Sequence, residues 1–198
     1  MKKFVLSCLV AVVASSSICF AQSSSDNDAK SAAIFAKIKK IDILYNLLPV
    51  LYTKAQINEL LPAIEKARAT ARKVMDQEAK DFATVEAECD KSISDALEKK
   101  ILPPRAARAD LSDLLNAMSA RRTIAALKNI DSVKTVFDKV MTPAQKKAAA
   151  NSLDPKLFDP KAKPEEMTLD EKETIYVREI LLAPMTYDLL VGMAKHTD

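Results

Sequence analysis

Apolar residues recur at every third or fourth position along most of this 198-residue chain, a spacing that places them on one face of an α-helix. The first stripe predicts a helix from about Asp28 to Pro49, where the proline ends it. The stripe consists of Phe35, Ile38, Ile41, Tyr45 and Leu48. No segment of strand length alternates apolar and polar residues. The pattern therefore predicts an all-α protein.

Two longer stripes occupy the centre of the chain. One covers residues 57–101 and predicts a helix of roughly 70 Å, which Pro62 is expected to kink. The other covers residues 111–141, and Pro103-Pro104 separates the two. We expect the two helices to fold back on each other as a long antiparallel helical hairpin.

The last third of the chain is interrupted by prolines. A short helix is expected over residues 143–151, and the later helical pattern breaks at Pro184. The expected organisation is one all-α domain over residues 28–198, made of a hairpin core (28–151), a proline-rich loop (152–167) and C-terminal helices (168–198).

Three of the predicted helices begin with a capping box. In this pattern a threonine oxygen accepts a hydrogen bond from the backbone three residues on, and a Gln or Glu there reaches back to the threonine amide. The pairs are Thr53 with Gln56, Thr142 with Gln145, and Thr168 with Glu171. We expect these side chains to have a structural role, which is to fix where each helix begins.

The first 21 residues have the three parts of an export signal. A basic start precedes an apolar run over residues 4–14, and small residues stand before Gln22. We expect a signal peptide over residues 1–21, a polar tether over 22–27, and a periplasmic or secreted mature protein without stable membrane insertion.

Two other interpretations of this segment stay open. A membrane anchor or buried first helix is one, although the apolar run has about half of the ~20 residues that span a bilayer. A lipoprotein anchored through Cys19 is the other, although Ile18 stands where lipidation prefers a small residue.

Composition after cleavage argues against several kinds of partner. Of the 30 Lys and Arg residues, Lys2 and Lys3 would leave with the signal, so 28 basic residues would face 27 acidic ones. A nearly neutral chain lacks the basic face that nucleic acid requires. The single glycine, Gly192, excludes glycine-rich phosphate loops, and no cofactor is expected.

The residue types that carry most enzyme chemistry are scarce. The only histidine, His196, lies near the chain end, where a frayed tail is the simplest interpretation. Without a histidine cluster we expect neither a metal site nor a general base. Cys89 would be the only cysteine after cleavage, and either a buried core thiol or a cysteine that pairs between chains fits its position.

Three sets of residues remain as candidates for chemistry or binding. The acidic pairs could flank a sugar, but without tryptophan we interpret them as solvated helix faces or first helical turns: Glu86 and Glu88, Glu165 and Glu166, Asp170 and Glu171. A basic cluster could meet an anionic partner or an unfolded acidic chain, or form a solvated surface: Lys99, Lys100, Arg105 and Arg108 at the hairpin tip, with Arg121 and Arg122 further on. The methionines could form an adaptable binding surface or fill the core: Met75, Met118, Met141, Met185 and Met193.

The doubled Thr-x-x-Gln motif resembles that of a known family. Tyr52-Thr53-Lys54-Ala55-Gln56 and Met141-Thr142-Pro143-Ala144-Gln145 are similar to the repeated Leu-Thr-x-x-Gln motif of the Spy-like periplasmic chaperones, with Tyr52 and Met141 in place of leucine. The similarity covers about residues 49–151 and extends to the way a long helix runs into the second motif. The resemblance implies an exported all-α protein that binds unfolded polypeptides without ATP.

The expected function is therefore non-enzymatic binding of non-native or partner polypeptides, as in an ATP-independent chaperone. The alternative is a structural or envelope-associated helical protein with one fixed partner. An elongated hairpin also leaves apolar faces that one thin layer cannot cover, which would allow a homodimer.

Overall fold

The computed structural model describes residues 26–196, with side chains from Ala29 onward. The expected signal peptide over residues 1–21 and the tether up to residue 25 lie outside the described residues. Within the described part the chain forms helices and no strand, which confirms the all-α prediction.

Nine helical elements follow one another along the described residues. They are α1 (Asp26–Leu47), the 3-10 helix η1 (Leu48–Val50), α2 (Lys54–Lys99), α3 (Arg105–Val140), α4 (Pro143–Asn151), the 3-10 helix η2 (Pro155–Leu157), α5 (Leu169–Tyr176), the π-helix η3 (Val177–Leu181) and α6 (Thr186–Ala194). The helix α2 continues through Pro62, and Pro184 lies in the turn between η3 and α6.

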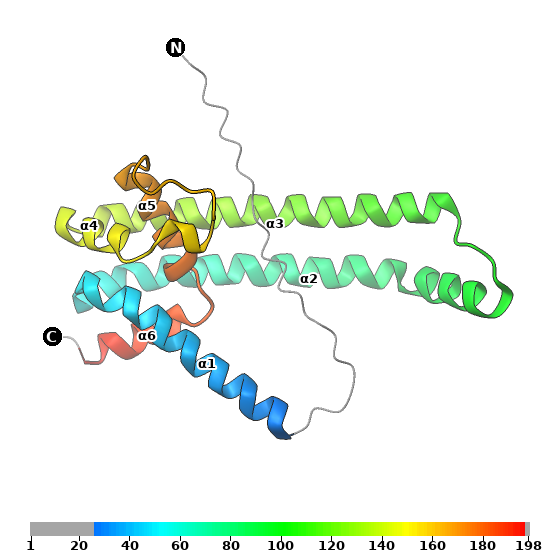
Figure 1. Ribbon diagram of the computed structural model, residues 1–198, viewed down its shortest axis with the longest axis horizontal. Coiled ribbons are helices and arrows are strands. Elements are labelled where there is room, and N and C mark those ends of the chain that lie inside the picture. Colours follow the sequence, from blue (N-terminus) through cyan, green and yellow to red (C-terminus); the bar gives the residue numbers. More distant parts are fainter. Residues whose placement is uncertain (1–25, 197–198) are drawn as a thin grey trace, which may run out of the picture.

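The long helices α2 and α3 lie side by side as an antiparallel hairpin (Figure 1). The other helices gather at one end of this hairpin, and the opposite end projects away from them. We call residues 71–126 the arm, and residues 43–70 with 127–196 the head. The α2 half of the arm extends for about 40 Å at 1.5 Å per residue.

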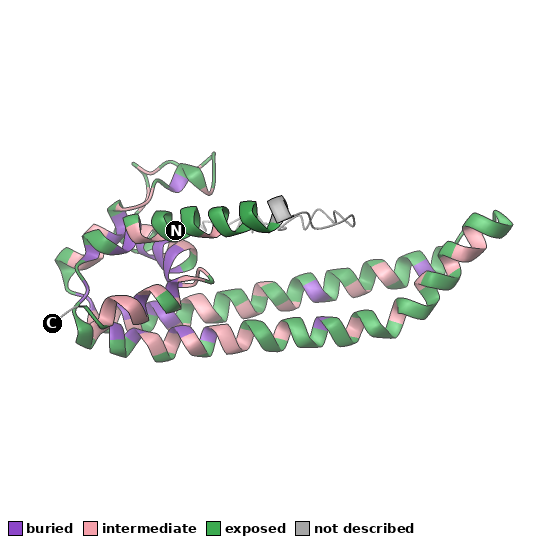
Figure 2. Ribbon diagram, turned by 90° about the horizontal axis from the view of Figure 1, so that it is seen from below, coloured by how far each residue is buried: buried purple, intermediate pink, exposed green. Residues whose placement is uncertain are grey.

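The hydrophobic core lies in the head, where the buried residues concentrate (Figure 2). The large side chains at its centre come from α1, α2, α3, α5 and α6, and include Leu47, Ile57, Leu60, Phe137, Tyr176 and Leu190. The rings of Phe137 and Tyr176 contact each other at 5.9 Å between centroids. The hydroxyl groups of Tyr52 and Tyr176 form a buried hydrogen bond of 2.9 Å, which ties the start of α2 to α5.

The two Thr-x-x-Gln capping boxes are joined to each other at the base of the hairpin. Each glutamine carbonyl accepts from the backbone N–H of its own threonine, at 3.0 Å for Gln56 and 3.1 Å for Gln145. The two side-chain amides then exchange hydrogen bonds of 2.8 and 2.9 Å. Each side-chain amide thus accepts a hydrogen bond at the start of its own helix and donates one to the glutamine of the other capping box.

Each glutamine also donates to a backbone carbonyl two residues before the other capping threonine. The Gln56 amide nitrogen donates to Val140 O at 2.9 Å, and the Gln145 amide nitrogen donates to Leu51 O at 3.0 Å. We call this reciprocal arrangement the amide clamp. It fixes the end of α3 against the start of α2, so the motif that marks helix starts also closes the hairpin.

A charged cluster attaches α5 to α3. The Lys134 ammonium lies 2.6 Å from Asp138, 2.8 Å from Asp170 and 3.1 Å from Glu173. Burial lowers the pKa of Lys134, but the hydrogen bonds to these three carboxylates outweigh burial and raise the pKa above its ordinary value. Lys146 lies 3.0 Å from Asp138 and brings α4 into the same cluster.

Two apolar stripes extend beyond the core that they were expected to build. On α2 the buried stripe ends at Ala67, and Phe82, Ile93 and Leu97 farther along are exposed. On α1 the side chains from Ile34 to Tyr45 that share one face are exposed as well. Most of the exposed large apolar side chains of the described chain therefore lie in two separate places, on the arm and on α1.

Candidate polypeptide-binding surface on the arm

Ion pairs hold the two helices of the arm together. Arg122 donates two hydrogen bonds to the Glu78 carboxylate, at 2.6 and 2.7 Å. Arg121 donates to Asp81 at 2.7 Å. The hydrogen bond to Glu78 raises the pKa of Arg122, and the hydrogen bond from Arg121 lowers the pKa of Asp81. These charges set the register of α2 against α3 where the arm has little core.

The Glu78 side chain is 6% exposed, whereas that of Arg122 is 58% exposed. Glu78→Gln removes the charge from the buried partner and is expected to weaken the arm by about 1–2 kcal/mol. Hydrogen exchange should then quicken across residues 71–126 and stay unchanged in the head. In the control Glu65→Gln, whose exposed carboxylate pairs with Arg72, exchange should hardly change. Unchanged exchange in the arm of the Glu78 variant would contradict this role.

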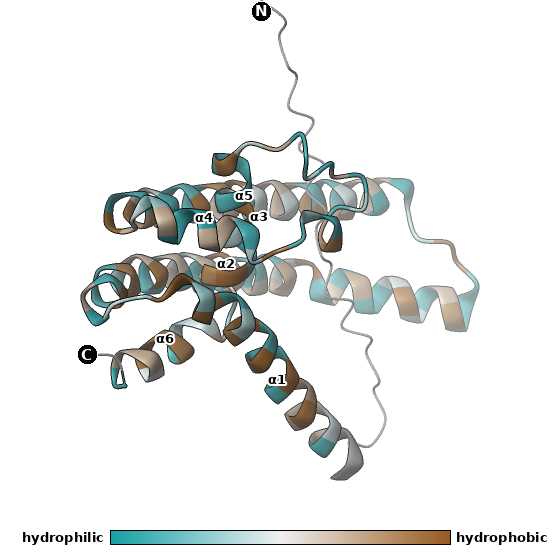
Figure 3. Cartoon of the chain, turned by 60° about the vertical axis from the view of Figure 1, so that its left-hand side comes forward, coloured by the Kyte–Doolittle hydropathy of each residue, from teal (hydrophilic) through white to brown (hydrophobic). Residues whose placement is uncertain are grey.

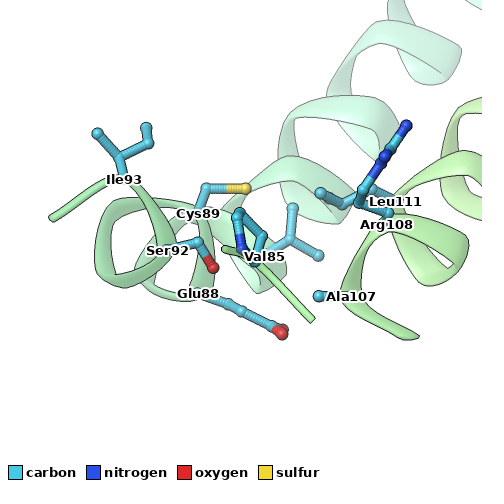
Figure 4. Close-up of a pocket in the computed structure, with 9 residues that line it drawn as sticks. Val85, Glu88, Cys89, Ser92, Ile93, Ala107, Arg108 and Leu111 are labelled. Carbon is cyan, nitrogen blue, oxygen red and sulfur yellow. The ribbon is translucent and has the colours of Figure 1, made fainter. Parts of the chain in front are cut away.

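Beyond these ion pairs, towards the hairpin tip, an apolar pocket of about 220 Å³ opens between α2 and α3 (Figure 4). Its lining residues are Val85, Glu88, Cys89, Ser92, Ile93, Pro103, Ala107, Arg108 and Leu111. On the α3 side the lining includes the small side chain of Ala107, which occupies little of the space between the helices.

A second, more open pocket of about 350 Å³ lies next to the first along α2. The two pockets share Val85 and Cys89. We call the combined apolar surface the arm groove, and define it by Phe82, Val85, Cys89, Ile93, Ala107 and Leu111. Farther along, at the tip, Leu97 and Leu102 are exposed as well. Figure 3 shows apolar (brown) and hydrophilic (teal) positions alternating along both helices of the arm.

Charges of both signs surround the arm groove. Glu86 and Glu88 lie on the α2 side and Arg108 on the α3 side. Lys100 and Arg105 are exposed at the tip, while Lys99 pairs with Asp95 at 2.7 Å. Arg121 and Arg122, which follow the tip cluster along the sequence, bind carboxylates of α2. Of the six basic residues that the sequence singled out, Lys100, Arg105 and Arg108 therefore remain without a carboxylate of α2 in an ion pair.

Cys89 is half-buried and its sulfur points into the space between the helices (Figure 4). Its exposure is intermediate between that of a buried core thiol and that of an exposed cysteine, the two interpretations that the sequence left open.

The methionines also divide between buried and exposed positions: Met118 and Met141 are buried in the hairpin, and Met75 is exposed on the arm. His196 is exposed beyond the end of α6.

The three acidic pairs lie in different parts of the structure and do not come together in one site. Glu86 and Glu88 are exposed on the arm, and Glu166 pairs with Lys163 in the loop before α5. Asp170 belongs to the Lys134 cluster, and Glu171 closes the third capping box. Hydrogen bonds from the backbone and side chain of Thr168 lower the pKa of Glu171.

The described residues offer no other built site. Among residues 26–196, no three His, Cys, Asp or Glu side chains come together in a way that could hold a metal ion. None of the helices in this range combines the length and apolarity that crossing a membrane requires. Comparison of the chain with models of known families, with curated proteins and with solved structures finds no match.

Proposed function

We propose that this protein is a non-enzymatic, ATP-independent binder of non-native polypeptides that acts in the periplasm or outside the cell. The arm groove is the binding surface. The observation that carries the proposal is an apolar groove left open on a two-helix arm that polar contacts already hold in register.

The ion pairs of the arm explain how such a groove is maintained. A thin pair of helices joined only by apolar side chains would close over them, because burial of those side chains is its main source of stability. Here the pairs Glu78–Arg122 and Asp81–Arg121 supply part of the attachment between the helices. Phe82 and Ile93 are thus left to contact another molecule.

The chemistry of the groove suits an unfolded or partly folded chain. Its two adjoining pockets follow one another along α2 from Phe82 to Ile93, so the groove fits a row of apolar side chains better than one compact small molecule. Burial of one such side chain contributes about 1.5–3 kcal/mol before the costs of association. A client would therefore bind weakly and leave without an energy source.

A direct test is the suppression of aggregation of several chemically denatured client proteins. The chain from Gln22 onward should suppress their aggregation at a near-stoichiometric ratio. The double variant Phe82→Glu/Ile93→Glu should need about tenfold more protein for the same effect, because two apolar contacts are lost and charge enters the groove. Absence of suppression with every client would refute the proposal.

Leu157→Glu provides the matched control. Leu157 is an exposed apolar residue of the head, in η2, away from the arm groove. The charge that this variant introduces should leave suppression unchanged. An equal loss in both variants would indicate a general effect of surface charge and would remove the arm groove from the proposal.

The alternative function, a helical spacer with one fixed partner, is favoured by the fixed register of the arm. In that case the arm groove would bind one natural partner and would not bind unrelated denatured clients. Suppression that is seen with several unrelated clients and lost in the Phe82→Glu/Ile93→Glu variant argues for the chaperone-like function.

A further inference from the structure

The helix α1 carries apolar side chains on two opposite faces. Ile43 and Leu47 on one face pack on the core of the head. Five large side chains on the other face are exposed: Ile34, Ile38, Ile41, Tyr45 and Leu48, the last in η1. A helix that is apolar on both sides is usually covered on both sides. We call the exposed set the α1 stripe.

The spacing of the α1 stripe is that of a coiled coil. Its members follow one another by four, three, four and three residues, which is the alternation of heptad positions d, a, d, a and d. This repeat keeps a seam facing a second helix over two heptads. The N-terminal part of α1 projects away from the head, so such a helix could approach it (Figure 1).

The charges beside the stripe select the partner and its direction. Lys37 occupies a g position and Asp42 the following e position, and both are exposed. In a parallel pair of identical helices, g faces the e position five residues later in the other chain, so Lys37 of each copy would meet Asp42 of the other. An antiparallel pair places g against g and forms neither ion pair.

The surface is also large enough for a pair of copies. Tyr45 is 77% exposed and each isoleucine of the stripe is more than half exposed. Covering the stripe on both copies, together with the neighbouring Phe35, would remove on the order of 1,200 Å² from water, the lower end for specific interfaces. The head covers the opposite face, which leaves an open arc suited to one partner helix.

We propose that two copies of this chain associate through a parallel coiled coil of their α1 helices. The interface is separate from the arm groove and does not rest on the proposed function. It would hold two arms in one particle. With two heptads, the dimer should dissociate in the micromolar range.

Sedimentation velocity of the chain from Gln22 onward, at 1–100 µM, tests the proposal. The unmodified chain should pass from monomer to dimer, and Ile38→Glu should raise the dissociation constant at least 100-fold. Ile93→Glu on the arm is the matched control and should leave it unchanged. A monomer throughout, or a dimer that survives Ile38→Glu, would overturn the proposal.

A charge exchange tests the direction of the helices. Lys37→Glu should weaken the dimer by placing like charges at g and e, and the double variant Lys37→Glu/Asp42→Lys should restore it. A double variant as weak as the single one would rule out the parallel pairing. Lys37, Asp42 and the Ile38 of the preceding variant are exposed in the monomer, so unchanged thermal unfolding at low concentration would show that the variants fold.

Discussion

Lys134→Met is expected to cost about 3–5 kcal/mol in the free energy of unfolding at pH 7. The ammonium is the shared counter-ion of Asp138, Asp170 and Glu173, and the Glu173 side chain is only 5% exposed. Methionine fills a similar volume but leaves the Glu173 carboxylate buried without its cation. Urea unfolding of both proteins would measure the loss.

The same substitution should make the free energy of unfolding less sensitive to acid. Burial raises the pKa of Asp138, but hydrogen bonds from Lys134 and Lys146 outweigh it and hold that pKa below its ordinary value of 3.8. The contribution of Asp138 is therefore present above pH 3.8 and is lost as the pH falls through the lower folded-state value. In the variant, protonation instead removes the charge of carboxylates that have lost their cation. The difference in the free energy of unfolding between the variant and the unmodified chain should therefore shrink on acidification.

A second substitution separates charge from packing. Lys134→Met/Glu173→Gln replaces the buried carboxylate by a neutral amide and should recover most of the lost stability. A single variant that costs less than about 1 kcal/mol, or a deficit that grows in acid, would show that the cluster does not hold α5 on α3.

Gln56→Glu is expected to cost about 2–3 kcal/mol, although glutamate is an accepted residue of a capping box. The new carboxylate can still accept from the Thr53 amide. It cannot donate to Val140 O or to Gln145, and it brings a negative charge to the Gln145 carbonyl oxygen. The expected loss comes from the amide clamp and not from the cap. Thermal and urea unfolding would measure it.

The third capping box provides the matched control. Thr168 and Glu171 form the same box at the start of α5, and the Glu171 carboxylate accepts hydrogen bonds from the backbone N–H and the hydroxyl of Thr168. Glu171→Gln should therefore change stability by less than about 0.5 kcal/mol. If Gln56→Glu were equally mild, the two glutamines would act only as caps.

Local chemistry made the helices of this protein predictable from the sequence. Prolines and capping threonines act within one turn, so α4 begins at Pro143 and α5 at Leu169, directly after their caps. Pairing between the boxes was not predictable, because it depends on contacts between Gln56 and Gln145, 89 positions apart. The one hint is chemical: the two boxes in the clamp carry glutamine and the solitary one carries glutamate.

The exposed apolar surfaces were harder to predict for the same reason. An apolar stripe shows which side chains share a face, but not whether another element covers that face. The stripe from Ile57 to Leu97 is continuous, yet the head covers only its first part. Arg121 and Arg122 resembled free surface charge, because their pairing with Asp81 and Glu78 depends on the register of the hairpin.

The amide clamp makes the hairpin a closed loop whose two ends meet between Leu51 and Gln145. Joining the ends of a flexible loop costs only about 0.6 kcal/mol more for each doubling of its length. Matched insertions of whole turns in α2 and α3 would thus lengthen the arm while the head keeps its contacts. The distance over which the arm extends can therefore change without any change in the head that anchors it.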